Sequence, residues 1–315
     1  MKKLSLVIPM YYEEEVAQTC YDRVKSNLDQ IKDNYDYEII FVNDGSKDKT
    51  LSILKDIAKK DKKVKVVSFS RNFGHQVAVT AGLKYVTGDA VLIMDADLQD
   101  PPEVIPDMLK KWEEGYEVIY GKRKSREGES AFKLLTASAF YSFLNKMSDT
   151  EIPKDTGDFR LVDKSVIEVI NSLPEHNKFL RGLFSWVGFN QYAFEYERKE
   201  RVAGKTKYPL KKMLKLAGDG IIGFSKKPLK MIYKMAFFSL FLFVAVIVAS
   251  IVIHVNNWQN VIMPGWTTIM LAITFLSSLI LFALGFIGEY IMRIYDETRQ
   301  RPQYIVKETV NVDKK

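Results

Sequence analysis

The chain has 315 residues, a hydrophobic content of 47% and a formal net charge of +7. Its one cysteine, Cys20, cannot form an internal disulfide, and together with three scattered histidines it lacks the ligand spacing of a zinc site. The positive charge permits a nucleic acid, a membrane surface or an anionic substrate as partner. No basic helix carries interleaved base-stacking aromatics, which argues against a nucleic acid.

The first 120 residues alternate short apolar runs with segments of helix length. Apolar strands separated by amphipathic helices predict an α/β fold with a mostly parallel sheet covered on both faces. Ligands of such sheets bind at the carboxyl ends of the strands, so we expect the functional site there. The predicted strands are Leu4–Ile8, Tyr37–Val42, Val64–Phe69, Ala90–Met94 and Glu117–Tyr120.

The middle of the chain, residues 121–230, has a weaker pattern. Phe132–Met147 and Lys211–Phe224 are typical of amphipathic helices, because lysines lie beside apolar faces. Phe189–Glu197 alternates like a half-exposed strand.

Two long apolar segments follow, Met235–Ile253 and Thr267–Ile287, and neither contains a charged residue. Each is long enough to cross a hydrocarbon core of about 30 Å, and a pair of buried core helices is the alternative. The link between them, residues 254–266, carries no lysine or arginine. The positive-inside rule therefore predicts a two-helix transmembrane hairpin with both termini in the cytoplasm. The flanking basic residues are Lys226, Lys227, Lys230, Lys234, Arg293, Arg299 and Arg301.

Two carboxylates follow the fourth predicted strand. Asp95 and Asp97 stand at positions i and i+2 of a strand end, so their side chains point the same way. With the amide oxygen of Gln99 they offer hard ligands suited to Mg²⁺ or Mn²⁺. A solvated acidic turn is the alternative.

Asp44 ends the second predicted strand in the same manner and can accept a hydrogen bond from a base or a ribose hydroxyl. A dinucleotide-binding fold is the rival interpretation. That fold requires a glycine-rich turn after the first strand, where this chain has Pro9–Glu14. No Walker glycine–lysine loop is present either, so redox and ATP-hydrolysing functions fit poorly.

These motifs, taken in order, resemble glycosyltransferase family 2. More narrowly, they resemble its polyprenyl-phosphate branch, which includes dolichol-phosphate mannose synthases and bactoprenol glucosyltransferases. With the two terminal spans, the resemblance covers essentially the whole chain. The strings that carry it are Val7–Pro9 with Glu13 and Glu14, Val42–Ser46, Arg71–Gly74, Asp95–Pro102, Thr156–Arg160 and Gly204–Leu210.

The resemblance implies an A-type glycosyltransferase fold and an inverting transfer of a sugar from a nucleotide sugar to a polyprenyl phosphate. The lysine-rich, bacterial composition favours UDP-glucose and undecaprenyl phosphate, in cell-envelope glycan modification, with UDP-N-acetylglucosamine or GDP-mannose as alternative donors. The processive-synthase string Q-x-x-R-W is absent, since the nearest stretch is Phe179–Trp186, which argues for a single transfer. A non-catalytic membrane scaffold is the alternative from another class, and the intact Asp95, Asp97 and Gln99 argue against it.

Position by position, the resemblance also implies site residues. Two positions depart from the family: Tyr12 stands where an asparagine is usual and Asn43 where an acid is usual, which affects fine contacts to the donor. The implied donor-nucleotide residues are Pro9, Tyr11, Glu13, Asp44, Arg71 and Asp95, and the implied metal ligands are Asp95, Asp97 and Gln99.

The acceptor chemistry bears on Asp158, which with Asp97 is an expected catalytic residue. A phosphate monoester is mostly dianionic at pH 7, because its second pKa is near 6, and needs little help from a base. We therefore expect Asp158 to orient the acceptor or a metal-bound group, and only secondarily to remove a proton. A structural pair with Arg160 is the alternative.

We expect the acceptor phosphate to bind Arg123, Arg201 and Lys207, since arginine forks and lysine charges suit phosphate. A solvated basic loop near anionic lipid is the alternative.

A two-helix hairpin is also able to associate into a homo-oligomer. The expected division is a cytoplasmic catalytic domain (1–210), a juxtamembrane amphipathic helix (211–230), two transmembrane helices (231–292) and a cytoplasmic tail (293–315).

Overall fold

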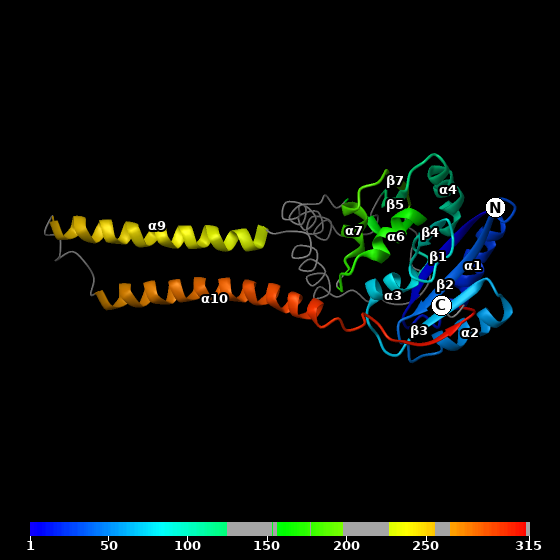
Figure 1. Ribbon diagram of the computed structural model, residues 1–315, viewed down its shortest axis with the longest axis horizontal. Helices are drawn as coiled ribbons and strands as arrows, with labels where there is room; N and C mark the ends of the chain where they lie inside the picture. The colour runs from blue at the N-terminus through cyan, green and yellow to red at the C-terminus, as the bar shows by residue number, and fades with distance from the viewer. Residues whose placement is uncertain (125–152, 154–155, 177, 198–226, 256–264, 313–315) are drawn as a thin grey trace. The chain divides into compact units, whose positions relative to one another are not determined.

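The computed structural model describes residues 1–124, 153, 156–176, 178–197, 227–255 and 265–312 (Figure 1). They fall into two compact units. One contains the N-terminal part of the chain together with Arg301–Lys315, and the other contains Ile221–Gln300. The predicted helices Phe132–Met147 and Lys211–Phe224 lie outside the described residues.

An eight-stranded sheet runs through the described part of the first unit, in the order β7-β5-β6-β4-β1-β2-β3-β8. β1 pairs in parallel with β2 and β4, β2 with β3, and β5 with β7, whereas β6 and β8 are antiparallel to their neighbours. The predicted α/β fold with a mostly parallel sheet is confirmed. The strands are β1 (Lys2–Met10), β2 (Tyr35–Asn43), β3 (Val64–Phe69), β4 (Ala90–Ile93), β5 (Val118–Arg123), β6 (Thr156–Asp163), β7 (Gln191–Tyr196) and β8 (Val306–Val310).

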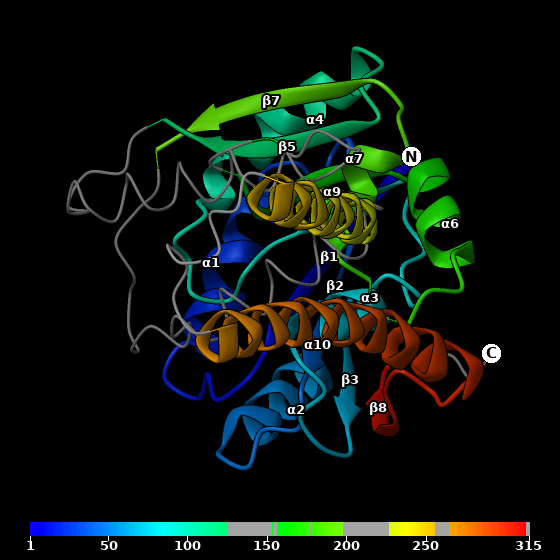
Figure 2. The same ribbon diagram turned by 90° about the vertical axis from the view of Figure 1, so that its left-hand side faces the viewer.

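Helices cover both faces of this sheet, as the apolar strands predict. Alternate residues of β1, from Leu4 to Met10, are fully buried and pack in one cluster with buried residues of α1, α2 and α4. α3, α6 and α7 lie on the other face; Figure 2 shows α1 and α6 on opposite sides of the strands. The helices are α1 (Ala17–Asp29), α2 (Thr50–Lys60), α3 (His75–Gly82), α4 (Ile105–Glu113), α6 (Lys164–Ser172) and α7 (Leu180–Trp186), with a short 3-10 helix, η1 (Pro102–Val104).

Strand direction decides where the connecting loops meet. β6 is antiparallel to both β4 and β5, so β5 runs in the same direction as β4. The carboxyl ends of β1, β2, β3, β4, β5 and β7 therefore share one edge of the sheet, and β6 starts at that edge. Loops from six parts of the sequence converge there.

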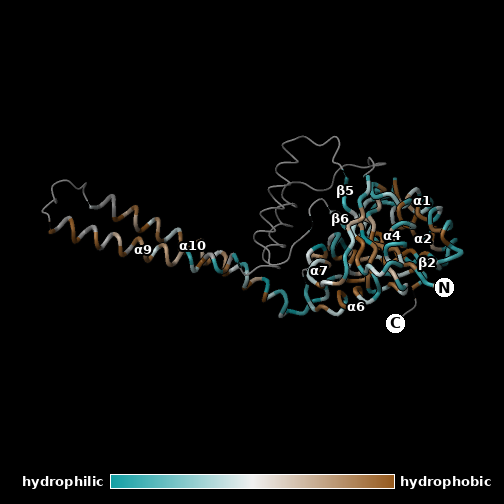
Figure 3. The backbone as a smooth tube through the Cα atoms, turned by 90° about the horizontal axis from the view of Figure 1, so that it is seen from above, coloured by the Kyte–Doolittle hydropathy of each residue, from teal (hydrophilic) through white to brown (hydrophobic). Residues whose placement is uncertain are grey.

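The second unit contains two long helices, α9 (Lys227–Val255) and α10 (Gly265–Thr298), drawn with their hydropathy in Figure 3. In α10, Ile269–Thr298 is long and apolar enough to cross a membrane, and its apolar window is not buried among the residues that the structure describes. In α9 the described residues give a shorter apolar helix, Ile232–Leu242. The two-span hairpin stays a prediction, supported for its second span by length and composition.

Candidate functional site at the carboxyl edge of the sheet

The site is centred on two aspartates that β4 and β6 bring together. The register of this antiparallel pair sets Ile93 opposite Arg160. Asp95 follows β4 by two residues and Asp158 precedes Arg160 by two, so the same register brings these two aspartates level. His75, the first residue of α3, lies between them: its Nε2 is 3.0 Å from Asp158 Oδ2 and 3.6 Å from Asp95 Oδ1.

Asp158 is held by several donors at once. Arg181, near the start of α7, donates from Nε to Oδ1 at 2.7 Å and from Nη2 to Oδ2 at 3.3 Å. Gln76 donates from Nε2 to Oδ2 at 3.2 Å, while its Oε1 accepts from the backbone N–H of Leu180. Burial opposes ionisation, but Arg181 and His75 hold the pKa of Asp158 well below its usual range. The carboxylate is therefore ionised, and most of its contacts are to Oδ2, while Oδ1 accepts from Arg181 alone among the described residues.

Arg160 is not the ion-pair partner of Asp158, so that alternative is wrong. Its guanidinium donates to the backbone carbonyls of Gly157 and Asp158 and lies 4.6 Å from the ring centroid of Phe184. Burial lowers the pKa of Arg160 to about 10. Arg181 takes the role that we considered for Arg160, because α7 carries it onto the start of β6.

Carboxylates crowd around Asp95. Burial raises the pKa of Asp95 to about 6. The charge of His75 lowers this pKa, whereas the negative charges of Asp158, Asp100 and Asp97 raise it further. For His75, burial lowers the pKa, but Asp95 and Asp158 raise it to about 9. Excess negative charge on hard oxygen atoms is the chemistry that a divalent cation fits.

The segment after β4 turns tightly. Asp97 Oδ1 accepts from the backbone N–H of Gln99 at 3.2 Å, and Leu98 has a φ of +56°, in the left-handed region. Among the described residues no cluster of three or more His, Cys, Asp or Glu side chains could hold a metal alone. Two carboxylates supply only part of the coordination shell of a divalent cation. They therefore fit a cation whose other ligands come from substrate phosphates.

The loops after β2 and β3 are joined through Asp44. Its buried carboxylate accepts from the backbone N–H of Phe73 at 2.7 Å, from that of Gly74 at 2.9 Å and from Asn72 Nδ2 at 2.7 Å. Burial raises the pKa of Asp44, although the two backbone N–H groups act against it. Gly45 has a φ of +66°, and a Cβ there would lie 2.3 Å from the Arg71 carbonyl carbon. Asp44 holds this loop, and its contact with a nucleotide stays a prediction.

The other predicted donor residues lie on the same edge. Pro9 is buried near the end of β1, and Tyr11 and Tyr12, both exposed, meet edge to face with ring centroids 4.8 Å apart. Glu13 donates its backbone N–H to Thr50 Oγ1 at 2.9 Å. Arg71 is exposed and stands 4.1 Å from the Phe73 ring centroid. The structure thus places Pro9 near the end of β1, Tyr11 and Glu13 on the loop after β1, and Arg71 on the loop after β3.

Of the predicted acceptor residues, only Arg123 is described. It ends β5, and its Nη2 would be 3.1 Å from a Cβ at Gly157. Its Nε is buried without a hydrogen-bond partner within the described part of the chain. Burial lowers the pKa of Arg123, but Tyr196 and Asp100, which hydrogen-bond each other, raise it overall. Arg201 and Lys207 lie outside the described residues.

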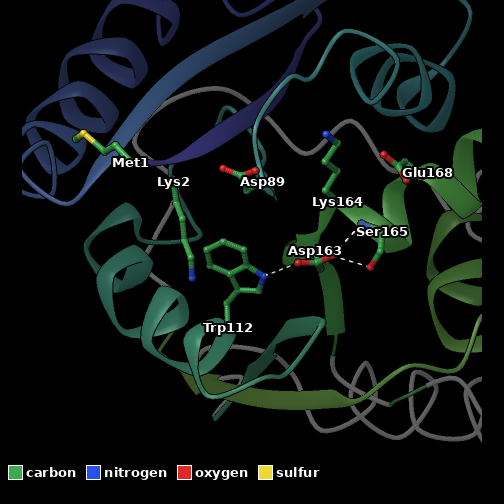
Figure 4. A pocket seen from close by; sticks show the side chains of 8 residues that line it. All are labelled: Met1, Lys2, Asp89, Trp112, Asp163, Lys164, Ser165 and Glu168. Atoms are coloured by element: carbon green, nitrogen blue, oxygen red, sulfur yellow. Dashed lines mark hydrogen bonds between the residues drawn. The ribbon is translucent and has the colours of Figure 1, made fainter.

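A separate hollow of about 580 Å³ lies at the opposite edge, where β1 begins and β6 ends (Figure 4). Its lining groups pair with one another: Trp112 Nε1 donates to Asp163 Oδ2 at 2.8 Å, and Lys2 Nζ lies 4.5 Å from the Trp112 ring centroid. None of the predicted site residues lines it, so we assign the chemistry to the carboxyl edge.

His75, Gln76 and Arg181 belong to the cluster around Asp95 and Asp158 at the carboxyl edge, and the sequence analysis did not identify them. His75 and Gln76 directly follow the Arg71–Gly74 string, which was the available signal. Arg181 stands in the stretch that was compared only with Q-x-x-R-W.

The family model "Glycosyl transferase family 2" matches residues 5–170. "Uncharacterized glycosyltransferase YkcC" of Bacillus subtilis is 49% identical over 99% of this chain and 95% of its own length. The "Bactoprenol glucosyl transferase" of Shigella phage SfX is 41% identical over 97% of this chain and 99% of its own. Among solved structures, mannosyl-3-phosphoglycerate synthase from Rubrobacter xylanophilus matches with a TM-score of 0.47 at 17% identity, covering 69% of this chain and 71% of that one.

Proposed function

This chain belongs to glycosyltransferase family 2, and we propose that it transfers glucose from UDP-glucose to undecaprenyl phosphate, forming a lipid-linked monosaccharide for cell-envelope glycans. Full-length relatives named bactoprenol glucosyl transferase support this reaction. The structural observation that carries it is the Asp95–His75–Asp158–Arg181 cluster at the carboxyl edge of the sheet. Intact carboxylates there argue against a non-catalytic scaffold.

In this proposal a divalent cation, Mg²⁺ or Mn²⁺, would be held by Asp95 and Asp97 with the amide oxygen of Gln99. Such a cation neutralises charge that develops on the leaving nucleoside diphosphate. The negative charges of Asp97, Asp100 and Asp158, which add to the effect of burial in raising the pKa of Asp95, support a cation at this position. The loops after β1, β2 and β3, carrying Tyr11 and Arg71, would hold the nucleotide.

The transfer itself is a displacement at the anomeric carbon. A phosphate oxygen of the lipid forms the new bond, the bond from that carbon to the diphosphate oxygen breaks, and the nucleoside diphosphate leaves with the electron pair. No proton has to be removed from a dianionic phosphate. We propose that Asp158, ionised and held by Arg181, orients the reacting groups, and that Arg123, Arg201 and Lys207 bind the acceptor phosphate.

Chain connectivity supports a membrane hairpin. β7 precedes α9, β8 follows α10, and both strands belong to the same sheet. The two ends of the second unit must therefore lie on the same side of any membrane, which requires an even number of crossings between Tyr196 and Val306. We propose that α9 and α10 are those two crossings.

The flanking lysines and arginines place the catalytic domain and both termini in the cytoplasm in this proposal. In this proposal residues 1–210 belong to the catalytic domain and 231–292 contain the two spans, while the expected juxtamembrane helix (211–230) lies mostly outside the described residues. Residues 293–315 include the end of α10 and then β8, which returns to the catalytic sheet.

The test is a panel of labelled nucleotide sugars incubated with the purified full-length protein and undecaprenyl phosphate, followed by lipid extraction. We expect label from UDP-glucose in the lipid fraction only when both the lipid phosphate and a divalent cation are present. If the lipid fraction is labelled only from UDP-N-acetylglucosamine or only from GDP-mannose, that nucleotide sugar is the donor and UDP-glucose is wrong. No lipid-linked label from any donor would contradict it.

A further inference from the structure

A series of aromatic rings connects the C-terminal segment with the loop after β3. Tyr304 stacks on Phe69, with ring centroids 5.0 Å apart and planes inclined by 21°. Phe69 meets Phe73 edge to face at 5.7 Å, and the Phe73 ring centroid is 4.1 Å from the guanidinium carbon of Arg71. The contacts are continuous from Tyr304 to Arg71.

Hydrogen bonds on both sides of Tyr304 fix its position. β8 pairs with β3, and Ser70, the first residue after β3, donates its N–H to the carbonyl of Ile305. On the other side of Tyr304, Gln303 Nε2 donates to the carbonyl of Glu175, before α7. The ring is therefore held from both directions along the chain.

The loop that receives this support is the one that we assign to the donor. We define the donor loop as Ser70–Gly74. At one end, the N–H groups of Phe73 and Gly74 are bonded to Asp44, and at the other, Phe69 is 2% exposed beneath the Tyr304 ring. Removing that ring uncovers Phe69, on which Phe73 packs, and so weakens the support of Phe73 and, through it, of Arg71.

We infer that Tyr304 is a positioning residue for the donor: the segment after α10 supports the donor loop through the Tyr304–Phe69–Phe73 stack. This inference rests on the proposed function, because it takes Ser70–Gly74 as a nucleotide-binding loop. It gives the C-terminal residues a role in nucleotide affinity, separate from any role in membrane attachment.

The experiment measures UDP binding calorimetrically, with Mn²⁺ present, to the detergent-solubilised full-length protein. Tyr304→Leu keeps apolar bulk but loses the ring, and Tyr304→Phe keeps the stack. Loss of an aromatic pair predicts roughly a two- to tenfold weaker UDP affinity for Tyr304→Leu. Tyr304→Phe should match wild type, and the KM for polyprenyl phosphate should not change in either variant.

The matched control removes another aromatic pair. Tyr192 of β7 contacts Tyr116 with ring centroids 5.1 Å apart, at the opposite end of the sheet from β8. Tyr192→Leu should lower stability to a similar extent without changing UDP affinity. An equal loss of UDP affinity in Tyr192→Leu and Tyr304→Leu would show that only general destabilisation is being measured, and would overturn the inference.

Hydrogen exchange separates this inference from the proposed function. Without nucleotide, Tyr304→Leu should speed exchange at the amides of Phe73 and Gly74, which bond to Asp44. If wild type binds UDP, and Tyr304→Leu binds it equally well with unchanged exchange at these amides, the inference is wrong while the proposed function stands. If wild type binds no nucleotide, the proposed function fails, and the role of Tyr304 in donor binding fails with it.

Discussion

Arg181 offers a sharp test of how the site is organised, because it is the charged partner of a buried carboxylate. Asp158 is 7% exposed and receives two N–H groups from Arg181, at 2.7 and 3.3 Å. A hydrogen bond to a charged group contributes about 1.5–3 kcal/mol, and breaking a buried ion pair costs about 3–5 kcal/mol. Since His75 and Gln76 still contact Asp158, we take the lower end, about 3 kcal/mol, for Arg181→Ala.

If that energy is lost in the transition state, kcat falls roughly a hundredfold, since each 1.36 kcal/mol is a factor of about ten in rate. Arg181→Lys keeps the charge but loses the fork, so we expect roughly a tenfold reduction. A positioning role predicts that kcat falls while the KM for the sugar nucleotide changes little, and that lysine partly rescues alanine.

Steady-state kinetics in detergent, at a temperature where each variant is folded by circular dichroism, measure this. Arg23→Ala is the control, because the Arg23–Glu103 contact of 2.7 Å is half-exposed and such surface pairs are worth about 0–1 kcal/mol. Wild-type kcat in Arg181→Ala would refute the reasoning, and so would equal losses in Arg181→Ala and Arg23→Ala.

Three further predictions follow from the metal site, a buried glutamate and the hairpin. Asp97→Asn should reduce transfer by several orders of magnitude with an unchanged thermal unfolding midpoint; near-normal turnover would contradict the metal site. Glu38 is buried, but hydrogen bonds from Lys65 and other donors lower its pKa to about 2. The ionised carboxylate therefore contributes roughly 3 kcal/mol to the free energy of unfolding. This contribution is present above about pH 4.5 and is lost as the pH falls towards 2. Urea unfolding from pH 6 to 2.5 should show this loss, and Glu38→Gln should flatten it; parallel curves would contradict it. In intact cells, a cysteine at Asn257, which lies outside the described residues, should react with an impermeant thiol reagent, whereas one at the exposed Asp56 should not; the reverse pattern would contradict the hairpin.

The sequence predicted the first four parallel strands well because each is a continuous apolar run buried on both faces. It did not reveal β6, since Thr156–Asp163 carries Asp158 and Arg160 in a buried strand, and burial of charge is possible there only because Arg181, His75 and backbone carbonyls pair with them. β8 was missed because its five residues, Val306–Val310, follow a long apolar helix and were assigned to the tail.

For the site, strand-end position was sufficient to place Asp44, Asp95 and Asp97 at one edge, as the sheet direction shows. The roles of individual groups depend on contacts between distant segments, which no local pattern reports. Arg181 reaches Asp158 because α7 packs beside β6, and the Asp44 carboxylate is occupied by the loop after β3. Which donor and acceptor groups each side chain contacts stays a prediction.

The most direct measurement of the central claim is the mass of the lipid product formed from UDP-glucose and undecaprenyl phosphate by the full-length protein. The account predicts one hexose joined to the intact lipid phosphate, formed only with a divalent cation and accompanied by one UDP released per lipid modified. Free glucose with unmodified lipid would contradict it, and so would a product carrying several hexoses.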